Sequence, residues 1–386
     1  MHSHFCGIDI SKDSFHAALL DAHGQSVWSR VFPMSLPGFR DLLAGLQPAT
    51  LVGLESTGIY GLSLFTFLDE QGCDVRLLNP LLIANFAKLS LRQTKTDKRD
   101  ATTIAAFLRQ NASTLAPAPQ ANEGLRALSR ERESLSGQII AAKNEIKRLL
   151  SLLFPEILRL VNPFGVSVLN LLSGFPSKDS IALASPTELR KILSAGRGRK
   201  PTLQISCLID AARSSVGISS PAYESILCSK IRIFQILNRE LEDMTQRLVQ
   251  ACRERSPQDM AILTSIDGLG DVTTAHFLAE THGRTFASSK KLIAFAGLDP
   301  IIRESGQWKG RGRISKRGNR SLRRVLFLMS VMVIRNNPVF RELYDRKRRE
   351  GKRYRQAVLA VAHKLLRVIY AMIRQQVPFN PELQSQ

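Results

Sequence analysis

The first 115 residues alternate strand-like and helix-like patterns, and this order constrains the fold more than any other feature of the chain. Runs rich in β-branched residues and bounded by turn residues are typical of strands, whereas longer periodic apolar segments are typical of helices. The patterns predict strands over 6–11, 14–21, 26–33, 50–56 and 74–80, and helices over 36–46, 58–72 and from about 95. Strands that alternate with helices in this way predict an α/β layer fold.

Two carboxylates stand at positions where strands are expected to be apolar or to end. Asp9 lies inside the apolar run CGIDIS, and Glu55 closes the apolar run LVGLES. A charge inside a core strand costs free energy unless something binds it. In open α/β sheets, ligands gather at the ends of strands. Taken singly, Asp9 also fits a turn residue and Glu55 also fits a helix cap.

A second acidic pair opens the segment KTDKRDATTIAAFLRQ, in which Asp97 and Asp100 are three residues apart. Residues at this spacing share a helix face, where two like charges repel unless a cation lies between them. Asp97 alone also suits the positive end of the helix dipole, and Asp100 could pair with Lys98 or Arg99. With Asp9 and Glu55, however, the pair supplies four hard oxygen donors, which predicts a site for one or two Mg²⁺ ions.

Beyond this α/β region the chain turns helical. TLAPAPQAN reads as a linker, and apolar residues then recur at heptad spacing from about Glu123. One seam comprises Leu128, Leu135, Ala142 and Leu149 with Leu125, Ile139 and Ile146, interrupted by Arg132; a second, over 229–254, comprises Ile233, Leu237, Leu241, Met244 and Leu248. We therefore expect a coiled-coil and helical region over 123–256, between an α/β domain over 1–115 and a third domain over 257–386.

The third region is mostly helical and strongly basic. The segment SIDGLGDVTTAHFLAE resembles a helix-hairpin-helix, whose turn offers backbone N–H groups to phosphates, although a plain helical hairpin fits it equally well. The cations expected to bind nucleic acid follow it: Lys309, Arg311, Arg313, Lys316, Arg317, Arg320, Arg323 and Arg324. A charge run is usually a solvated face, but a large excess of cations favours nucleic acid.

The net charge supports this assignment. The chain has 54 Lys and Arg against 33 Asp and Glu, a formal charge of +21, which favours a polyanionic partner. Nucleic acid is the first candidate and an anionic membrane surface the second. The longest apolar run, over 326–334, is about half of a bilayer span, so we expect no membrane insertion. Five scattered cysteines without a CxxC pair favour a reducing cytoplasm.

These motifs together resemble a known family. The order of Asp9, Glu55 and a later Asp pair is similar to the RuvC/ribonuclease H fold, and GIDISKDSF…ESTGIYG…LLNP…KTDKRDA resembles the DEDD transposases of the insertion-sequence one-ten family, to which the Piv DNA invertases are related. FAGLDPIIRESG followed by GRGRISKRGNRSLRRVLF resembles the second conserved block of the same family. QWKGRG after the ESG departs from the pattern and leaves the geometry of this loop open.

The resemblance implies an enzyme that cleaves and exchanges DNA strands. It implies that Ser305, the serine of the ESG motif, is the nucleophile, next to Mg²⁺ held by Asp9, Glu55, Asp97 and Asp100. It also implies double-stranded donor and target DNA, a bridge-type guide RNA, and homodimers that pair into tetramers, with the carboxylates and the serine drawn from different protomers. The expected location is the bacterial or archaeal cytoplasm, at the nucleoid.

Two other functions fit parts of the same pattern. A RuvC-like nuclease or junction resolvase would use metal-activated water, with no covalent intermediate and no need of Ser305. A non-catalytic nucleic-acid-binding protein with a relict acidic pocket would keep its binding when Asp97 and Asp100 become Asn. The LESTG and KTDKRDA blocks together argue against this second alternative.

Overall fold

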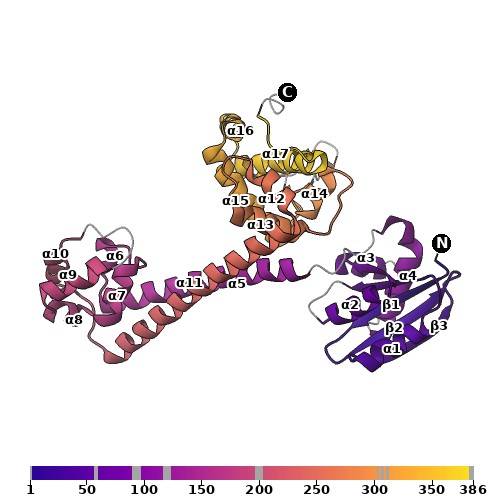
Figure 1. The fold of residues 1–386 in the computed structure, drawn as a ribbon, viewed down its shortest axis with the longest axis horizontal. Coiled ribbons are helices and arrows are strands. Elements are labelled where there is room, and N and C mark those ends of the chain that lie inside the picture. Colours follow the sequence, from indigo (N-terminus) through magenta and orange to yellow (C-terminus); the bar gives the residue numbers. More distant parts are fainter. Residues whose placement is uncertain are drawn as a thin grey trace. The chain divides into compact units, whose positions relative to one another are not determined.

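A computed structural model gives the fold of the chain (Figure 1). It describes residues 2–55, 60–88, 97–115, 123–195, 203–301, 304–305, 308–309 and 313–381. The side chains of 97–99, 123, 304–305, 308–309 and 313 are outside this description. The chain divides into two compact units, Met1–Glu123 and Gly124–Gln386.

The first unit is a mixed α/β domain built on one five-stranded sheet with the order β3-β2-β1-β4-β5. Its elements are β1 (His4–Ile10), β2 (Ser14–Asp21), β3 (Ser26–Pro33), α1 (Leu36–Gly45), β4 (Thr50–Glu55), α2 (Leu62–Glu70), β5 (Asp74–Leu78), α3 (Pro80–Ala87), α4 (Asp97–Asn111) and a 3₁₀ turn (Ala112–Thr114). β1, β2 and β3 are antiparallel neighbours, whereas β1–β4 and β4–β5 are parallel. The predicted strands and their order along the chain are thus confirmed.

Each face of the sheet packs against its own helices because side chains alternate along a strand. One face carries Cys6 and Ile8 of β1 in a core that includes residues of α1 and α2, such as Leu42 and Leu64. The opposite face carries Phe5 of β1 in a core with residues of α3 and α4. Asp9 follows Phe5 at an even spacing and therefore belongs to the α4 face.

Two glycines let α4 approach the sheet closely. A Cβ atom on Gly7 would lie 2.2 Å from the Ala101 carbonyl oxygen and 2.3 Å from the Ala105 amide nitrogen. A Cβ atom on Gly53 would lie 2.6 Å from a methyl carbon of Leu108. Gly7 and Gly53 are register partners on β1 and β4, so the backbone of α4 rests on the middle of β1 and its Leu108 side chain rests on the middle of β4.

The second unit is mostly helical. Its elements are α5 (Glu123–Leu153), α6 (Ile157–Leu160), α7 (Val166–Gly174), α8 (Lys178–Leu183), α9 (Pro186–Ala195), α10 (Ile205–Arg213), α11 (Pro221–Arg255), α12 (Pro257–Thr264), α13 (Asp271–Thr281), α14 (Ser289–Phe295), β6 (Pro300–Ile301), β7 (Glu304–Ser305), β8 (Trp308–Lys309), β9 (Arg313–Ile314), α15 (Arg320–Asn336), α16 (Pro338–Arg349) and α17 (Tyr354–Gln375).

Two apolar cores lie at opposite ends of the long helices α5 and α11, which run side by side (Figure 1). One core joins the later turns of α5 and the first turns of α11 to the short helices α6–α10. The other joins Leu125 of α5 and Leu248 of α11 to the helices α12–α17. A hydrogen bond from Arg132 Nε to Thr245 Oγ1, 2.8 Å long, links the two long helices between these cores.

The predicted seam of α5 is buried except for the half-buried Leu128, whereas the predicted seam of α11 is partly wrong. Leu135, Ile139 and Leu149 of α5 are buried as expected. In α11 the buried positions of the first turns include Ile231 and Phe234, whereas Ile233 is 43% exposed. Apolar residues occupy more than one face of this segment, so spacing alone did not identify the inward one. Whether the two helices supercoil stays a prediction.

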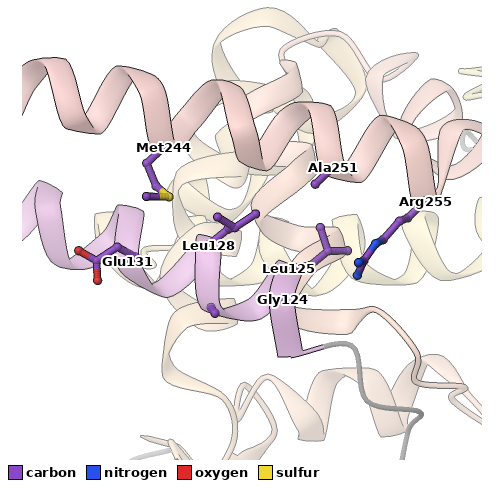
Figure 2. Close-up of a pocket in the computed structure, with 8 residues that line it drawn as sticks. Gly124, Leu125, Leu128, Glu131, Met244, Ala251 and Arg255 are labelled. Atoms are coloured by element: carbon purple, nitrogen blue, oxygen red, sulfur yellow. The ribbon is translucent and has the colours of Figure 1, made fainter.

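A groove of about 440 Å³ opens between the first turns of α5 and the last turns of α11 (Figure 2). Leu125 and Leu128 line it from α5, and Met244 and Ala251 line it from α11. These apolar side chains make the groove a continuation of the helix seam, and Glu131 and Arg255 add two charged side chains to its lining.

Helix α17 is the one helix of the described residues that is long and apolar enough to cross a membrane. Half of its most apolar 18-residue stretch is buried inside the protein. Val361, Leu365 and Ile369 are fully buried in the core with α15, as in the central helix of a folded domain.

We expect Gly7→Ala to destabilise the protein by about 3 kcal/mol or more, because the new methyl group would meet backbone atoms that cannot move aside. The matched control is Gly137→Ala in α5, where a Cβ atom meets nothing within 4 Å, so this change should be neutral or stabilise by up to about 1 kcal/mol. Urea unfolding followed by circular dichroism measures both. A Gly7→Ala protein as stable as the wild type would contradict the packing of α4.

Candidate functional site

The carboxyl ends of β1 and β4 bring two of the predicted metal ligands to one edge of the sheet. Ile8 pairs with Leu54, and Asp9 and Glu55 are the next residues of these parallel strands. Residues in the same register of neighbouring strands point to the same face. Asp9 and Glu55 therefore share the face that α4 covers, and both are half-buried.

The direction of α4 brings its first turn to the same edge. Its last turn lies at the opposite end of β1, where Arg109 Nη1 donates to the Ala22 carbonyl oxygen at 3.4 Å, in the turn that follows β2. Ala101 lies over Gly7, two residues before Asp9. The half-buried Asp100 precedes Ala101 and so approaches the end of β1 that carries Asp9. Asp97 begins the helix, but its side chain is outside the described residues.

The donor set suits a hard divalent ion because all of its members are carboxylates. Among the side chains that the structure describes, no group of three His, Cys, Asp or Glu residues is gathered closely enough to hold a metal ion. The side chain of Asp97 is not among those described. The structure therefore brings Asp9, Glu55 and the start of α4 to one edge, and metal binding there stays a prediction.

Ser305 lies near the tip of a β-hairpin in the second unit. At the base, Pro300 and Ile301 of β6 pair with Ile314 and Arg313 of β9. Further out, Glu304 pairs with Lys309, and Ser305 pairs with Trp308, so only two residues separate the paired ends of β7 and β8. The side chains of Ser305, Lys309 and Arg313 are outside the described residues, as is the whole of Arg311.

The base of this hairpin is held by close backbone packing. A Cβ atom on Gly318 would lie 2.2 Å from the Phe295 carbonyl oxygen and 2.3 Å from the Gly297 amide nitrogen. The amide of Lys316, which has a left-handed φ of 54°, donates to the Gly297 carbonyl oxygen at 3.0 Å. The Ser315 hydroxyl donates to the Asp299 carboxylate. The segments before and after the hairpin are thus joined at several points.

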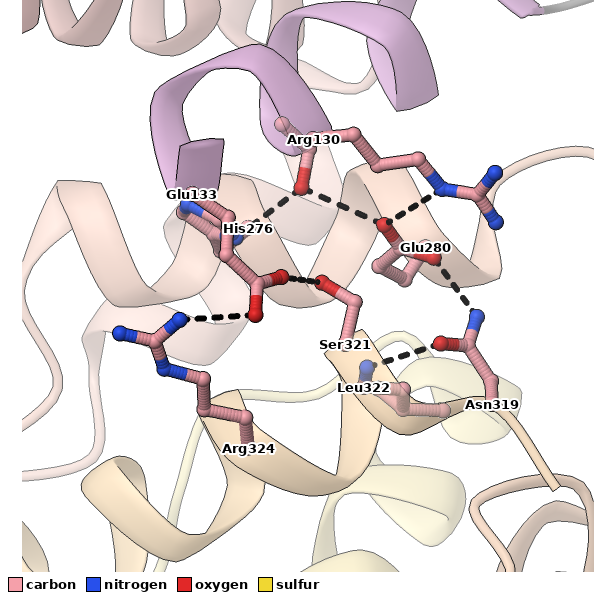
Figure 3. Close-up of polar contacts among 9 residues, drawn as sticks. Arg130, Glu133, His276, Glu280, Asn319, Ser321, Leu322 and Arg324 are labelled. Atoms are coloured by element: carbon pink, nitrogen blue, oxygen red, sulfur yellow. Dashed lines mark hydrogen bonds and ion pairs between the residues drawn. The ribbon is translucent and has the colours of Figure 1, made fainter. Parts of the chain in front are cut away.

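A buried carboxylate fixes the end of this base (Figure 3). Glu280 of α13 is fully buried, and its Oε2 accepts a 2.6 Å hydrogen bond from Asn319 Nδ2. Asn319 is the N-cap of α15, since its Oδ1 accepts from the Leu322 amide at 3.0 Å. The other oxygen of Glu280 lies 3.9 Å from Arg130 Nε and accepts from Ser129 Oγ at 3.4 Å. A buried carboxylate needs such partners to offset its lost hydration.

The same network contains a buried histidine. His276 Nδ1 lies 3.0 Å from Ser129 Oγ, and His276 Nε2 lies 3.2 Å from Arg132 Nη1 (Figure 3 draws the first of these contacts). Burial, followed by the positive charge of Arg132, lowers the pKa of His276 to about 4. The ring is therefore neutral at pH 7 and joins α13 to α5.

A third contact ties α5 to the start of α15. The Glu133 carboxylate accepts from Ser321 Oγ at 2.6 Å and from Arg324 Nη1 at 2.8 Å (Figure 3). Burial acts to raise the pKa of Glu133, but these two hydrogen bonds outweigh it, so the pKa is lowered. Sequence reasoning missed this network; the one available signal was the polar His276 inside the apolar run of α13.

Two of the cations expected to bind nucleic acid have partners within the protein. Arg324 pairs with Glu133, and Arg323 Nη1 donates to the Ala296 carbonyl oxygen at 3.0 Å. Lys316, Arg317 and Arg320 have exposed side chains beside the hairpin base. Phosphate contacts by any of these residues stay a prediction.

The segment read as a helix-hairpin-helix, 265–280, forms a short turn and most of α13, and the helix before the turn is α12, which ends at Thr264. Gly268 has a left-handed φ of 97° and lies against the Met332 carbonyl oxygen of α15, where a Cβ atom would come within 2.7 Å. Ile266 and Leu269 of the turn are buried. The turn is thus anchored on α15, and Gly270 stands before α13 with open space around it.

Comparison with known proteins gives matches along most of the chain. A DEDD-type transposase model matches residues 6–155, and a model described as transposase IS116/IS110/IS902 family matches residues 260–345. An insertion element IS900 protein of Mycobacterium paratuberculosis is 30% identical over 74% of this chain and 73% of its own length. An insertion element IS110 protein of Streptomyces coelicolor is 28% identical over 96% and 94%. The pilin gene-inverting protein of Moraxella bovis is 26% identical over 99% of both chains.

The buried His276 predicts how stability depends on pH. Its pKa is lower in the folded state than the ordinary 6.5, so the unfolded chain binds the proton more tightly and acid favours unfolding. This contribution is complete above about pH 6.5 and is lost as the pH falls to about 4, a loss of about 3 kcal/mol.

In His276→Gln the free energy of unfolding should depend less on pH over this range than in the wild type, as measured by urea unfolding at pH 7, 6, 5 and 4. His23→Gln, which changes an exposed histidine, should keep the wild-type dependence. Equal pH dependence in the wild type and His276→Gln would show that His276 is not buried in its neutral form.

Proposed function

Because this chain belongs to the IS110 family of transposases, we propose that it breaks and rejoins DNA through a covalent bond to Ser305. The observation that carries the proposal is the register of Asp9 and Glu55, which brings two carboxylates and the first turn of α4 to one edge of the sheet. The name of the Moraxella relative, pilin gene-inverting protein, supports recombination rather than simple hydrolysis.

The first unit is proposed to be a RuvC/ribonuclease H-like domain. Its sheet has three antiparallel strands followed by two parallel ones, with β1 at the centre and the last helix packed on β1. Ligands collect at the carboxyl ends of parallel strands. This is the edge that Asp9 and Glu55 occupy.

Asp9, Glu55, Asp97 and Asp100 would together hold one or two Mg²⁺ ions. When bound, such ions neutralise charge on a phosphate and stabilise the oxygens that attack and leave. The protein's own part is to keep carboxylates in fixed register, and the packing of α4 on Gly7 supports this rigidity. A rigid site costs less reorganisation during the reaction.

Ser305 is proposed to attack the phosphorus of a DNA phosphodiester. Its Oγ loses a proton and bonds to phosphorus, the bond from phosphorus to the 3′-oxygen breaks, and that oxygen takes up a proton. The phosphoserine keeps the energy of the phosphodiester, so a 3′-hydroxyl from another duplex can displace Ser305 without a further energy source. A position near the tip of a short hairpin suits a nucleophile that must reach a DNA backbone.

We also propose donor and target DNA duplexes as substrates, a bridge-type RNA as guide, and a homodimer that assembles to a tetramer. The RNA would read sequence by base pairing, and the protein would contact backbone. The exposed apolar residues Ile226, Ile233 and Ile236 of α11 support an assembly through the long helices. Such a complex would act in the cytoplasm, at the nucleoid.

The serine is tested with Ser305→Ala. Incubated with RNA, DNA and Mg²⁺, the wild type should give a slow-migrating DNA adduct that protease removes. Ser305→Ala should reduce the adduct by at least about 1000-fold, because no other group can form the bond. Ser206→Ala, an exposed serine of α10, is the control and should form the adduct normally. Nicked DNA without any adduct would instead favour a nuclease that uses water.

The carboxylates are tested with Asp9→Asn, Glu55→Gln and Asp100→Asn. Each should lower Mg²⁺-dependent cleavage by about 100-fold or more, because each removes a charge that holds the ion. Mg²⁺ should raise the thermal midpoint of the wild type by binding to the folded state, and this rise should shrink in the variants. Asp69→Asn, an exposed acid of α2, should behave as the wild type in both assays. Variants that keep both responses would refute the metal site.

A further inference from the structure

The end of α16, the following turn and the start of α17 form a basic corner. We use this name for Arg346, Lys347, Arg348, Arg349, Lys352, Arg353 and Arg355, a set of seven cations interrupted by one acid, Glu350. The two helices pack against each other (Figure 1). The match to the IS116/IS110/IS902 family model ends at residue 345, just before the corner.

Internal contacts give the corner a defined shape. Lys347 Nζ lies 2.9 Å from the Glu350 carboxylate, and Arg348 Nη1 donates to the Lys352 carbonyl oxygen at 2.8 Å. Gly351 has a left-handed φ of 79°, which lets the chain reverse between the helices. Two of the seven cations therefore stabilise the turn itself.

The other cations face solvent. The side chains of Arg346, Arg349, Lys352, Arg353 and Arg355 are exposed, and in the part of the chain that the structure describes no carboxylate lies within ion-pair distance of any of them. Arg346 and Arg349 are three residues apart and so lie on one face of α16. Arg353 and Arg355 flank the N-terminus of α17, whose helix dipole adds to the positive potential.

We infer that the basic corner binds the phosphate backbone of double-stranded DNA. The inference rests on the proposed function only in taking DNA as the substrate. A duplex carries one charge per about 1.7 Å of its axis, so a corner with five exposed cations can neutralise several phosphates at once. Such contacts position a duplex without reading its sequence.

The surroundings of the corner favour a duplex over a membrane. Membrane binding by a basic helix requires an apolar face that enters the lipid. The apolar face of α17 is buried instead, with Ala357, Val358 and Val361 in the core of the unit. The Tyr354 and Tyr344 rings lie at 75° to each other, with centroids 6.3 Å apart, so together they do not form one flat stacking surface for the bases of a single strand.

The test is a variant that combines Arg346→Gln, Arg349→Gln, Arg353→Gln and Arg355→Gln. Binding to a duplex is measured without Mg²⁺ over a range of salt concentrations, so that no strand is cut. The plot of log affinity against log salt should become shallower by about 2 to 4, because each lost phosphate contact changes the slope by about 0.9. Affinity near 0.15 M salt should fall about tenfold or more.

A matched control removes four exposed cations elsewhere in the same unit, with Arg159→Gln, Arg190→Gln, Lys191→Gln and Arg213→Gln. Both variants lower the net charge of +21 by four, so a general charge effect would change both slopes equally. We expect the control to keep the wild-type slope. Circular dichroism and thermal melting check that both variants are folded.

Three results would overturn the inference. The first is an equal salt slope in the corner variant and the wild type, and the second is an equal change of the salt slope in the corner variant and the control. The third is a corner variant that binds DNA normally and loses binding only to RNA duplexes or to vesicles containing phosphatidylserine. The adduct assay with Ser305 is independent of these measurements. A protein that binds DNA through the corner but forms no adduct would refute the proposed chemistry alone. An adduct with an unchanged salt slope would refute the corner alone.

Discussion

The contact on which the α/β unit depends is the one between the backbone of α4 and Gly7 of β1. A side chain at Gly7 would occupy the space of the Ala101 carbonyl and the Ala105 amide, so only glycine allows this approach. The contact at Gly7 sets the distance between α4 and the sheet. The contact of Leu108 with Gly53, on the neighbouring strand, sets the lateral position of α4 on the sheet. A helix held in this way cannot slide without lifting off the sheet. Its first turn therefore stays at the edge where Asp9 and Glu55 lie, at the carboxyl ends of β1 and β4.

In the helical unit, buried polar groups have a comparable role. Glu280 costs free energy to bury, and its contacts with Asn319, Ser129 and Arg130 offset that cost. An apolar residue there would fill the space without selecting one arrangement of its neighbours. The carboxylate accepts from two different segments, so it specifies how the cap of α15 lies against α5. Since Asn319 follows the return strand of the Ser305 hairpin, the same contact fixes one end of the hairpin base.

The sequence predicted the five strands of the α/β unit and the helices α1, α2 and α4, because their apolar patterns are determined locally, but it did not predict α3. Asp9 and Glu55 were identified because a charge in or after an apolar strand is costly. The register that aligns them depends on pairing between distant segments, which no local pattern encodes. Ile233 was assigned to the wrong face because α11 has apolar residues on more than one side. Glu280 was missed because an acid near the end of an apolar helix looks like an ordinary surface residue.

The net charge of +21 overstates the number of cations that can contact a partner, because some of them bind groups within the protein. Arg324 is bound to Glu133, and Arg323 holds the Ala296 carbonyl, although both stand in a run that reads as an exposed basic stretch. In the basic corner, by contrast, most cations lack an internal partner within the described residues. Cations near the hairpin thus serve partly to build it, while those of the corner remain to bind. A division of this kind would let DNA affinity depend on salt more strongly than the hairpin base does, because Glu133 and Arg323 are partly buried and partly buried groups are screened less than exposed charges.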